Sequence, residues 1–445
     1  MRSLNVVLIH CHDTGRYIQP YGFPVCTPHM QRIAQEGMLF RRMYCAAPSC
    51  SPSRAALLTG QYPHSAGMLG LVNRGFDIAH PERHLALHLS CNGFHSILAG
   101  VQHILFDRNR SPYDEILDDK DRSPTDVIDQ GLKAIDRVKD RPFFLDIGFF
   151  DTHRPFDDMH LRIDPNYIRP ALPLPDVASV RRDMAGFYTQ AMRFDDWVGM
   201  VVGGLRDRGL LSNTLVIVTS DHGIAFPTMK CSLTDHGTGV LFMMRLPGVV
   251  PPGAVCDELV SQTDVFPTIC DLLDIPRPQW LQGRSMLPLL QMRNDPLHEA
   301  IFAELNYHCN YEPQRAVRTD RYLYIQRYTD FDTTHTANCD PSPTKEAYIQ
   351  HGWIGRKVDR YQLYDTFFDP VECQNVAQDP AYASVLTHLQ SLLFAWQQKT
   401  DDPILRGRIT EYSTNTADGC IYVNAREDIE PLDVFQRCKR EKGYS

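Results

Sequence analysis

Thr214-Leu215-Val216-Ile217-Val218 is an unbroken apolar run that leads into Ser220-Asp221-His222-Gly223 and follows a helical pattern over about residues 183–208. A short apolar run of this kind, entered from a helix, is typical of a strand that is buried on both faces of a parallel sheet. The same order of elements recurs along the chain. We therefore predict an α/β fold with a mostly parallel central sheet and helices on both faces.

Other segments of the first 300 residues fit the same pattern. The run Val6-Val7-Leu8-Ile9 predicts a buried strand, and Thr27-Pro28 predicts the N-cap and first residue of a helix that ends at Gly37. Ligands of such sheets bind beyond the carboxyl ends of the strands, so Asp13 and Asp221, each just past a strand, mark the expected site. The remaining predicted elements are strands at residues 96–98 and 143–149 and a helix at residues 124–139.

From residue 301 onward the pattern changes to short strand candidates separated by polar loops. The candidates are Ala316-Val317-Arg318, Tyr322-Leu323-Tyr324-Ile325 and Tyr361-Gln362-Leu363-Tyr364-Asp365, followed by a helix at residues 382–399. They predict a smaller C-terminal α+β domain with a short antiparallel sheet over residues 301–400, after a catalytic domain over residues 1–300. The extension over residues 401–445 has weak periodicity, and its sequence assigns it no role.

Composition narrows the classes of function. With 445 residues and 43% apolar content, the chain is long enough for one large domain and a smaller one. A net charge of −9 without basic runs argues against nucleic-acid or anionic-membrane partners. The 13 cysteines are odd in number and irregularly spaced, and the apolar segment near Met1 is too short for a signal peptide core or a membrane span. These features predict a cytoplasmic protein with reduced thiols.

The run Cys50-Ser51-Pro52-Ser53-Arg54-Ala55-Ala56-Leu57-Leu58-Thr59-Gly60 places a cysteine and an arginine in one local geometry. Pro52 suits the first turn of a helix and Gly60 suits its end, so Cys50 is expected at the helix N-terminus. Unpaired N–H groups and the positive end of the helix dipole favour a thiolate or a bound oxyanion there. Arg54 lies one turn on and is expected to point back at the same anion. We therefore interpret Cys50 as a catalytic centre.

This run matches, position by position, the signature C-x-P-S-R-x-x-L-L-T-G, and on that ground the chain resembles the sulfatase family. The resemblance extends over about residues 4–400 and implies an alkaline-phosphatase-like fold. It also implies that a formylglycine-generating enzyme oxidises Cys50 to formylglycine, and that the hydrated aldehyde is the nucleophile that attacks sulfur. Arg54 would then stabilise charge on the sulfuryl oxygens.

Two pairs of aspartate and histidine predict a divalent metal site beside Cys50. His12-Asp13 follows the first strand and Asp221-His222 follows a later one, so two carboxylates and two imidazoles can converge. The resemblance implies that Asp13, Asp221, His222 and the residue made from Cys50 bind Ca²⁺. Family members usually carry two consecutive aspartates after the first strand, and His12 replaces the first of them. Imidazole is a poor ligand for Ca²⁺ and a good one for Mn²⁺, Fe²⁺ or Zn²⁺, which leaves those ions open as alternatives.

The resemblance assigns three more residues to the sulfate group. His153, in Phe149-Phe150-Asp151-Thr152-His153-Arg154-Pro155, resembles a histidine that contacts the sulfate ester, and Lys230 resembles a lysine that contacts the leaving-group oxygen. Gly100-Val101-Gln102-His103 resembles the family's Gly-Lys-x-His motif, with His103 kept and Val101 in place of the lysine. Gln102 is a candidate for a neutral hydrogen bond in the lysine's place. The implied roles are stabilisation or protonation of the leaving atom for His153 or Lys230, and proton removal from the second hydroxyl for His103.

Within the family, the chain is most similar to the sulfamidase branch, the N-sulfoglucosamine sulfohydrolases. The similar segments include Gly67-Met68-Leu69-Gly70-Leu71 and Arg141-Pro142-Phe143-Phe144-Leu145. This similarity implies an N- or O-sulfated glucosamine, or another small sulfated sugar, as the substrate. Residues 306–318 and the loop after His153 are expected to contact the sugar, with Tyr307, His308 and Arg315 as candidates that are equally compatible with surface roles. A homo-oligomer is compatible with the sequence, which does not decide the oligomeric state.

Three alternatives stay open. A phosphonate monoester hydrolase or phosphodiesterase of the same superfamily would use a similar centre, and His12 with His222 is compatible with an Mn²⁺-type site for it. A catalytically inactive carbohydrate-binding relative would account for Val101 and His12. The third alternative is a hydrolase that uses unmodified Cys50, although no other motif supplies the histidine partner that such an enzyme needs.

Overall fold

The computed structural model describes residues 4–105, 110–117, 123–138, 141–157, 159–293, 295–329, 331–334, 336–407 and 409 of the 445-residue chain. The predicted extension therefore lies outside the described residues from residue 410 onward. No helix within these described ranges is long and apolar enough to cross a membrane.

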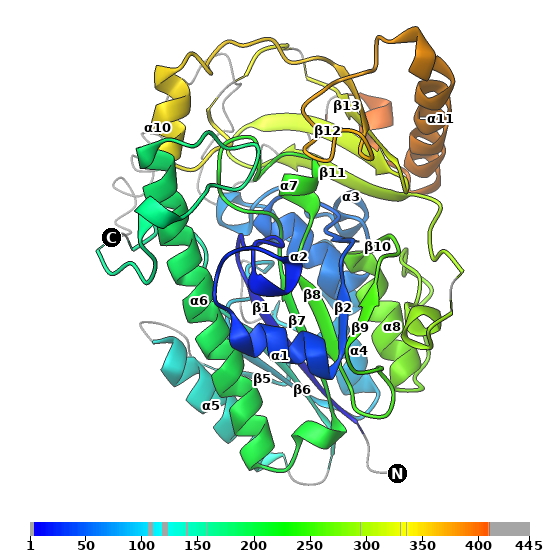
Figure 1. The fold of residues 1–445 in the computed structure, drawn as a ribbon. Coiled ribbons are helices and arrows are strands. Elements are labelled where there is room, and N and C mark those ends of the chain that lie inside the picture. The colour runs from blue at the N-terminus through cyan, green and yellow to red at the C-terminus, as the bar shows by residue number, and fades with distance from the viewer. Residues whose placement is uncertain are drawn as a thin grey trace.

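An eight-stranded sheet forms the centre of the molecule (Figure 1). The strands from β5 to β7 in the spatial order below are parallel, whereas β8 is antiparallel to both β7 and β2, and β9 is parallel to β2. The prediction of a mostly parallel central sheet is confirmed. The order is β5 (Glu115–Ile116), β4 (His95–Gly100), β6 (Phe143–Gly148), β1 (Asn5–Cys11), β7 (Thr214–Ser220), β8 (Phe242–Arg245), β2 (Met38–Phe40) and β9 (Ala254–Cys256).

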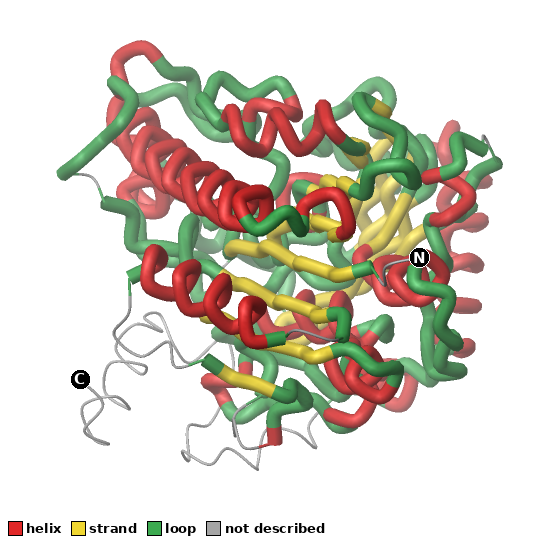
Figure 2. The backbone as a smooth tube through the Cα atoms, turned by 90° about the horizontal axis from the view of Figure 1, so that it is seen from below, coloured by secondary structure: helices red, strands yellow, loops and turns green. Residues whose placement is uncertain are grey.

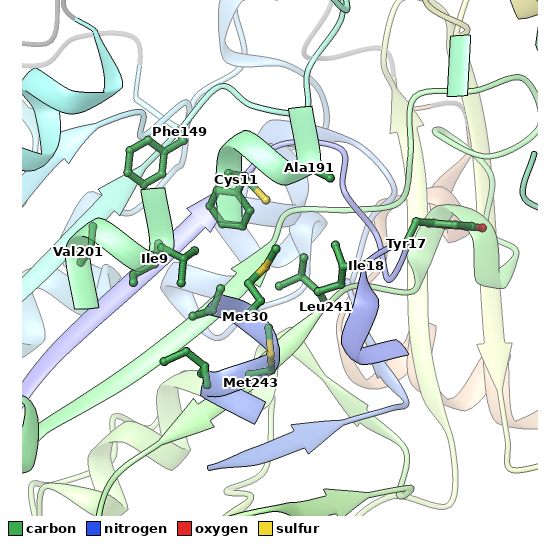
Figure 3. Close-up of a cluster of buried hydrophobic side chains, with 14 of the residues drawn as sticks. Ile9, Cys11, Tyr17, Ile18, Met30, Phe149, Ala191, Val201, Leu241 and Met243 are labelled. Carbon is green, nitrogen blue, oxygen red and sulfur yellow. The ribbon is translucent and has the colours of Figure 1, made fainter. Parts of the chain in front are cut away.

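Helices cover both faces of this sheet, and Figure 2 shows them on either side of the strands. The alternation of β1 explains the arrangement, because successive side chains of a strand point to opposite faces. Val7 and Ile9 pack among α1, α5 and α6, in the cluster that Figure 3 shows in part, whereas Val6 and Leu8 pack among α2, α4 and α8. These helices are α1 (Pro28–Glu36), α5 (Pro124–Arg137), α6 (Ala178–Asp207), α2 (Cys50–Thr59), α4 (Leu85–Cys91) and α8 (Val265–Leu272).

The helix ends follow their local sequence closely. Thr27 and Gly37 flank α1 as its N-cap and C-cap, as predicted. The helix α6 begins at Ala178, before the predicted start at residue 183, because its first turn buries only Val180 and so has little apolar periodicity. The shorter elements are α3 (Pro63–Ala66), α7 (Asp235–Thr238), α9 (Leu287–Leu290), and β3 (Met43–Tyr44) paired with β10 (Val260–Ser261).

A second sheet of four antiparallel strands lies over one end of the first, above it in Figure 1. The helix α11 packs on it through Trp396, and this apolar cluster also includes Ala56 of α2, so the second sheet contacts the helix that begins at Cys50. The predicted C-terminal antiparallel sheet is confirmed, while the exact domain limits stay a prediction. Its elements are β11 (Ile301–Tyr307), β12 (Tyr311–Arg318), β13 (Tyr322–Arg327), β14 (Tyr361–Asp365), α10 (Pro343–Gln350) and α11 (Ala383–Lys399).

Candidate active site

The parallel pairing of β1 with β7 brings the two Asp-His pairs together. Cys11 and Ser220 are partners at the ends of these strands, so the loops that follow leave the sheet side by side. The backbone N–H of Asp13 donates to Asp221 Oδ1 over 2.9 Å. Asp13 has a φ of 43°, a left-handed conformation in which aspartate is tolerated better than most residues. Both carboxylates are buried, which requires partners of opposite charge.

His222 is oriented by its own backbone. Its Nδ1 lies 2.9 Å from the carbonyl oxygen of Gly223, to which it donates, so Nε2 presents its lone pair to the site when the imidazole is neutral. Nε2 lies 3.0 Å from Asp13 Oδ1 and 3.3 Å from Cys50 Sγ. Gly223 is required next to it, because a Cβ at this position would lie 1.8 Å from the carbonyl oxygen of His236.

His12 completes the cluster, and its environment is the one expected of a metal ligand. The side chain is buried and stacks on the ring of Phe150. Its Nδ1 lies 3.2 Å from Asp221 Oδ2, whereas Nε2 has no hydrogen-bond partner among the described residues. Burial, followed by the charge of Arg54, holds the pKa of His12 well below its usual range, so the imidazole is neutral. One donor atom each from His12, Asp13, Cys50 and Asp221 lies within 4.8 Å of all the others. A buried neutral imidazole with one unpaired nitrogen, beside two carboxylates, matches the donor set of a divalent ion.

Cys50 is the first residue of α2, as predicted. Only 2% of its surface is exposed, and every residue of α2 is buried. Ser49, the N-cap residue, has its hydroxyl 2.9 Å from His308 Nδ1. Because the helix dipole is positive at this end, α2 favours negative charge on the atom that Cys50 presents.

Arg54 lies one turn into α2, but its guanidinium is directed to the ends of the sheet strands. It donates to Asp221 Oδ2 over 3.1 Å and to His10 Nδ1 over 2.6 Å. His10 Nε2 then donates to Asp146 Oδ1 over 2.8 Å, and Tyr113 donates to the other oxygen of Asp146. This series of hydrogen bonds was not predicted from the sequence. Asp146 was a detectable signal of it, because a single carboxylate inside the apolar strand β6 indicates a buried polar network.

Lys230 lies between two carboxylates. Its Nζ is 2.9 Å from Asp13 Oδ2 and 3.0 Å from Asp340 Oδ2. Burial opposes the charge, but the two carboxylates raise the pKa of Lys230 well above its usual range, so the ammonium is charged. Asp340 carried no sequence signal, because it lies in an irregular segment before α10 rather than beyond a strand of the main sheet.

His103 and His153 flank His12 on the open side of the cluster. Their ring centroids lie 5.7 Å and 5.4 Å from that of His12. Burial and the charge of Arg54 lower the pKa of His103 to about 4, so it is neutral near pH 7. Arg154, the residue after His153, forms a bidentate pair with Asp183 of α6 at 2.7 Å and 2.8 Å. That pair, which was not predicted, anchors the loop that carries His153.

Three of the proposed contacts are placed elsewhere by the structure. Gln102 does not replace the missing lysine, because its side chain donates to Leu105 O and accepts from two backbone N–H groups of its own loop. Tyr307 is buried in the core and donates to Ile409 O. Arg315 is fully buried and pairs with Asp402 at 2.7 Å and 2.8 Å. Most of residues 306–318 form the hairpin of β11 and β12, whose side chains are largely buried.

The site opens into a pocket of about 620 Å³. His12, Cys50, His103, His153 and Lys230 line its inner end, which brings five of the predicted site residues to one cavity. The second sheet and the segment before α10 close the opposite side, with His308 and Asp340 among the residues that line it. A pocket of this volume accommodates a monosaccharide-sized ligand.

Comparison with known protein families identifies two matching models. The model described as Sulfatase matches residues 4–275, and the model described as N-sulphoglucosamine sulphohydrolase, C-terminal, matches residues 230–353. Among individual relatives, human N-sulphoglucosamine sulphohydrolase is 31% identical and covers 90% of this chain and 91% of its own length. An ulvan-active sulfatase from Formosa agariphila is 29% identical and covers 85% of this chain and 76% of its own length.

Solved structures share the fold at lower identity. A protein solved in complex with its substrate D-glucosamine-2-N,6-O-disulfate has a TM-score of 0.73 and 17% identity, covering 90% of this chain and 99% of its own. A phosphonate monoester hydrolase from Silicibacter pomeroyi has a TM-score of 0.71 and 19% identity, covering 92% of this chain and 98% of its own. Both likenesses concern the fold alone.

Proposed function

The chain belongs to the sulfatase family of sulfuric ester hydrolases, and we propose from this premise that it cleaves the sulfamate or sulfate ester of a small sulfated sugar such as a glucosamine. One observation carries the proposal. Cys50 begins a buried helix, its Sγ lies 3.3 Å from His222 Nε2, and it forms part of a four-residue donor cluster at the inner end of a sugar-sized pocket. The similarity to human N-sulphoglucosamine sulphohydrolase supports the substrate class.

In the proposed reaction Cys50 acts as formylglycine, whose hydrate attacks sulfur. The α2 dipole stabilises negative charge on the attacking oxygen. Lys230, charged and held by Asp13, stabilises the leaving atom together with His153. His103, neutral because of its lowered pKa, accepts the proton of the second hydroxyl as sulfate departs. The placement of His103, His153 and Lys230 along one pocket supports these roles.

We also propose that the metal is a first-row ion such as Mn²⁺ or Zn²⁺ rather than Ca²⁺. When bound, the ion would supply Lewis-acid polarisation of the sulfuryl oxygens. The residues that would hold it are His12, Asp13, Asp221 and His222, together with the oxygen derived from Cys50. The buried imidazole of His12, whose Nε2 has no hydrogen-bond partner among the described residues, supports the choice, because nitrogen donors favour these ions over Ca²⁺.

Calorimetric metal titration tests the identity of the ion without reference to activity. We expect the wild-type chain to bind Mn²⁺ or Zn²⁺ more tightly than Ca²⁺. We expect the substitution His12→Asp to shift this metal preference toward Ca²⁺. His160→Asp, at an exposed histidine, serves as the matched control and leaves the preference unchanged. A Ca²⁺ preference that is identical in wild type and His12→Asp would remove His12 from the ligand set.

Turnover of a substrate panel tests the reaction itself. The panel comprises N-, 2-O-, 3-O- and 6-O-sulfated glucosamines, a chromogenic sulfate ester and a phosphonate monoester. We expect sulfated sugars to give the highest kcat/KM. The fold shared with a phosphonate monoester hydrolase and the imidazole-rich cluster favour phosphonate ester hydrolysis as the second candidate, which a higher kcat/KM for the phosphonate would establish.

Intact mass tests the state of Cys50. Conversion to formylglycine lowers the mass by about 18 Da, since a CH₂SH group is exchanged for CHO. Protein from a host that contains a formylglycine-generating enzyme is expected to show this species, and Cys50→Ala is expected to lack the shift. Full retention of the thiol, combined with sugar binding in the absence of turnover, would support an inactive carbohydrate-binding relative instead.

A cytoplasmic location and maturation by a formylglycine-generating enzyme belong to the same proposal. The eleven cysteines within the described residues are all unpaired, which supports a reducing compartment. Cell fractionation with detection of the intact chain tests the location, and recovery in an oxidising compartment would contradict it.

A further inference from the structure

A carboxylate from the C-terminal half of the chain reaches the catalytic end of the pocket. Asp340 Oδ2 lies 3.0 Å from Lys230 Nζ, while Asp13 Oδ2 lies 2.9 Å from the same nitrogen. The side chain of Asp340 is 21% exposed and lines the pocket together with Cys50 and His153. Lys230 is therefore shared between a carboxylate of the donor cluster and a carboxylate of the pocket wall.

The backbone on both sides of Asp340 is held in place. Two residues earlier, Asn338 Oδ1 accepts from the N–H groups of Cys309 and Asn310 over 2.9 Å and 2.8 Å. Two residues later, Ser342 caps α10 by accepting from the N–H of Lys345 over 3.0 Å. Asp340 is thus fixed before a ligand arrives, as a preorganised recognition group requires.

A carboxylate at this place opposes the binding of an anion. Two like charges at close range repel each other, and near a protein surface this repulsion is stronger than in bulk water, so Asp340 cannot face the sulfuryl oxygens favourably. Nor is it needed to neutralise Lys230, which already pairs with Asp13. The part of the substrate that the Asp340 carboxylate can face favourably is therefore the leaving group, which Lys230 is also proposed to contact.

The two candidate leaving groups differ in the charge they end with. In sulfamate hydrolysis the S–N bond breaks, its electron pair stays on nitrogen, and a new S–O bond forms to an oxygen that comes from water. The sulfamate anion and water together give an ammonium ion and the sulfate dianion. In ester hydrolysis the S–O bond breaks instead, and the products are a neutral alcohol, the sulfate dianion and a proton. A fixed carboxylate favours the nitrogen that becomes a cation and disfavours the oxygen that carries negative charge as it leaves.

We propose that Asp340 is a specificity-determining residue that accepts hydrogen bonds from the leaving nitrogen and so selects N-sulfated over O-sulfated sugars. The inference rests on the proposed function and specifies the substrate class of the same site. Lys230 and Asp340 then both contact the leaving atom, Lys230 as a hydrogen-bond donor and Asp340 as a hydrogen-bond acceptor.

Asp340→Asn tests this selection. We measure kcat/KM for N-sulfated glucosamine and for 6-O-sulfated N-acetylglucosamine, and expect the ratio of the two values to fall about ten- to a hundredfold, the range typical of one lost charge-assisted hydrogen bond. Asp207→Asn removes a carboxylate from an exposed position at the end of α6, away from the residues that line the pocket, and leaves the ratio unchanged. An equal loss for both substrates would make Asp340 a positioning residue for Lys230 and overturn the proposal, and so would an unchanged ratio.

Binding of unsulfated sugars separates this inference from the proposed function. At about pH 6.5 the amine of D-glucosamine is largely protonated, as amines of this type are below their pKa. Calorimetric titration of the wild-type chain is expected to show tighter binding of D-glucosamine than of D-glucose, and Asp340→Asn is expected to remove the difference. Equal binding of both sugars by wild type overturns the role of Asp340. If the difference is preserved in a chain that cleaves no sulfate, the proposed function is refuted, and only the recognition of the sugar nitrogen by Asp340 remains.

Discussion

Cys50 is the residue on which the proposed chemistry depends, and its small, buried side chain makes it a clean target. Cys50→Ala removes one sulfur atom from the start of α2 and leaves the helix otherwise unchanged. We expect turnover to fall by more than about a thousandfold, since no nucleophile remains, with little change in melting temperature. Cys91→Ser, at an exposed cysteine in α4, is the control and retains activity. Residual turnover above that limit would exclude Cys50 as the nucleophile.

At the residue scale, the sequence was most informative where a motif lies on a strand end or a helix start. Cys50, Asp13, Asp221, His12 and His222 all converge as predicted, because parallel strands bring their carboxyl ends to one edge of the sheet. The roles assigned to these residues stay a prediction.

The residues that sequence reasoning misplaced or missed depend on tertiary packing. Gln102 turns into its own loop, which no local pattern shows. Asp340 reaches the site from a segment with no periodicity, and its partner Lys230 lies 110 positions earlier in the chain. Contacts over such separations are not encoded in local spacing.

At the element scale, one ion pair ties the second sheet to the segment after α11. Arg315 of β12 is fully buried, and Asp402 binds its guanidinium through both carboxylate oxygens. Burial opposes the charge of Asp402, but Arg315 lowers the pKa of Asp402 to about 2. Since an unfolded aspartate titrates near 3.9, the pair contributes about 2–3 kcal/mol of stability at neutral pH.

Asp402→Asn is therefore expected to lower the free energy of unfolding by about 3 kcal/mol at pH 7, because it removes the carboxylate that binds a buried guanidinium and leaves only Glu304, 3.9 Å away, as a counter-charge. A group with a lowered pKa stabilises above its unfolded pKa and loses that contribution as the pH falls through its folded pKa. The difference between wild type and variant should accordingly shrink between about pH 5 and pH 2. Urea unfolding across this range measures it.

Asp401→Asn is the matched control for that experiment. Asp401 is adjacent in sequence, but its ion pair with Arg406 is exposed, so the change is expected to cost less than about 0.5 kcal/mol at any pH. If the difference in the free energy of unfolding between wild type and Asp402→Asn stays constant from pH 7 to pH 2, the charge of the Arg315–Asp402 pair does not contribute to stability.

At the scale of the whole molecule, the donor cluster joins the end of β1, the start of α2 and the end of β7. A bound metal should therefore stabilise the entire fold rather than one loop. At a free metal concentration about a hundredfold above Kd, the stabilisation is about 2.7 kcal/mol. Thermal unfolding after chelation should show a lower melting temperature that returns when metal is restored.

Asp221→Asn supplies the control for chelation, because it removes a central carboxylate of the cluster. Its melting temperature is expected to be insensitive to chelator. A wild-type melting temperature that does not respond to metal would contradict the assignment of the cluster as a metal site.

The general architecture was the most predictable property of the chain. The apolar runs that became β1, β6 and β7 are buried on both faces, and that pattern already indicates a covered parallel sheet. The antiparallel strand β8 between β7 and β2 was not predicted, because the sequence of a four-residue strand does not indicate its direction in the sheet.

The complete burial of α2 bears on the order of events in the cell. Once the sheet closes, no second enzyme can reach Cys50, so the proposed oxidation must precede folding. The sheet cannot close before β7 exists, and about 160 residues separate Cys50 from that strand, which takes roughly ten to thirty seconds to translate at about 5–20 residues per second. The yield of active protein would then depend on how fast the modifying enzyme works on a nascent chain, and protein that folds first would remain permanently inactive.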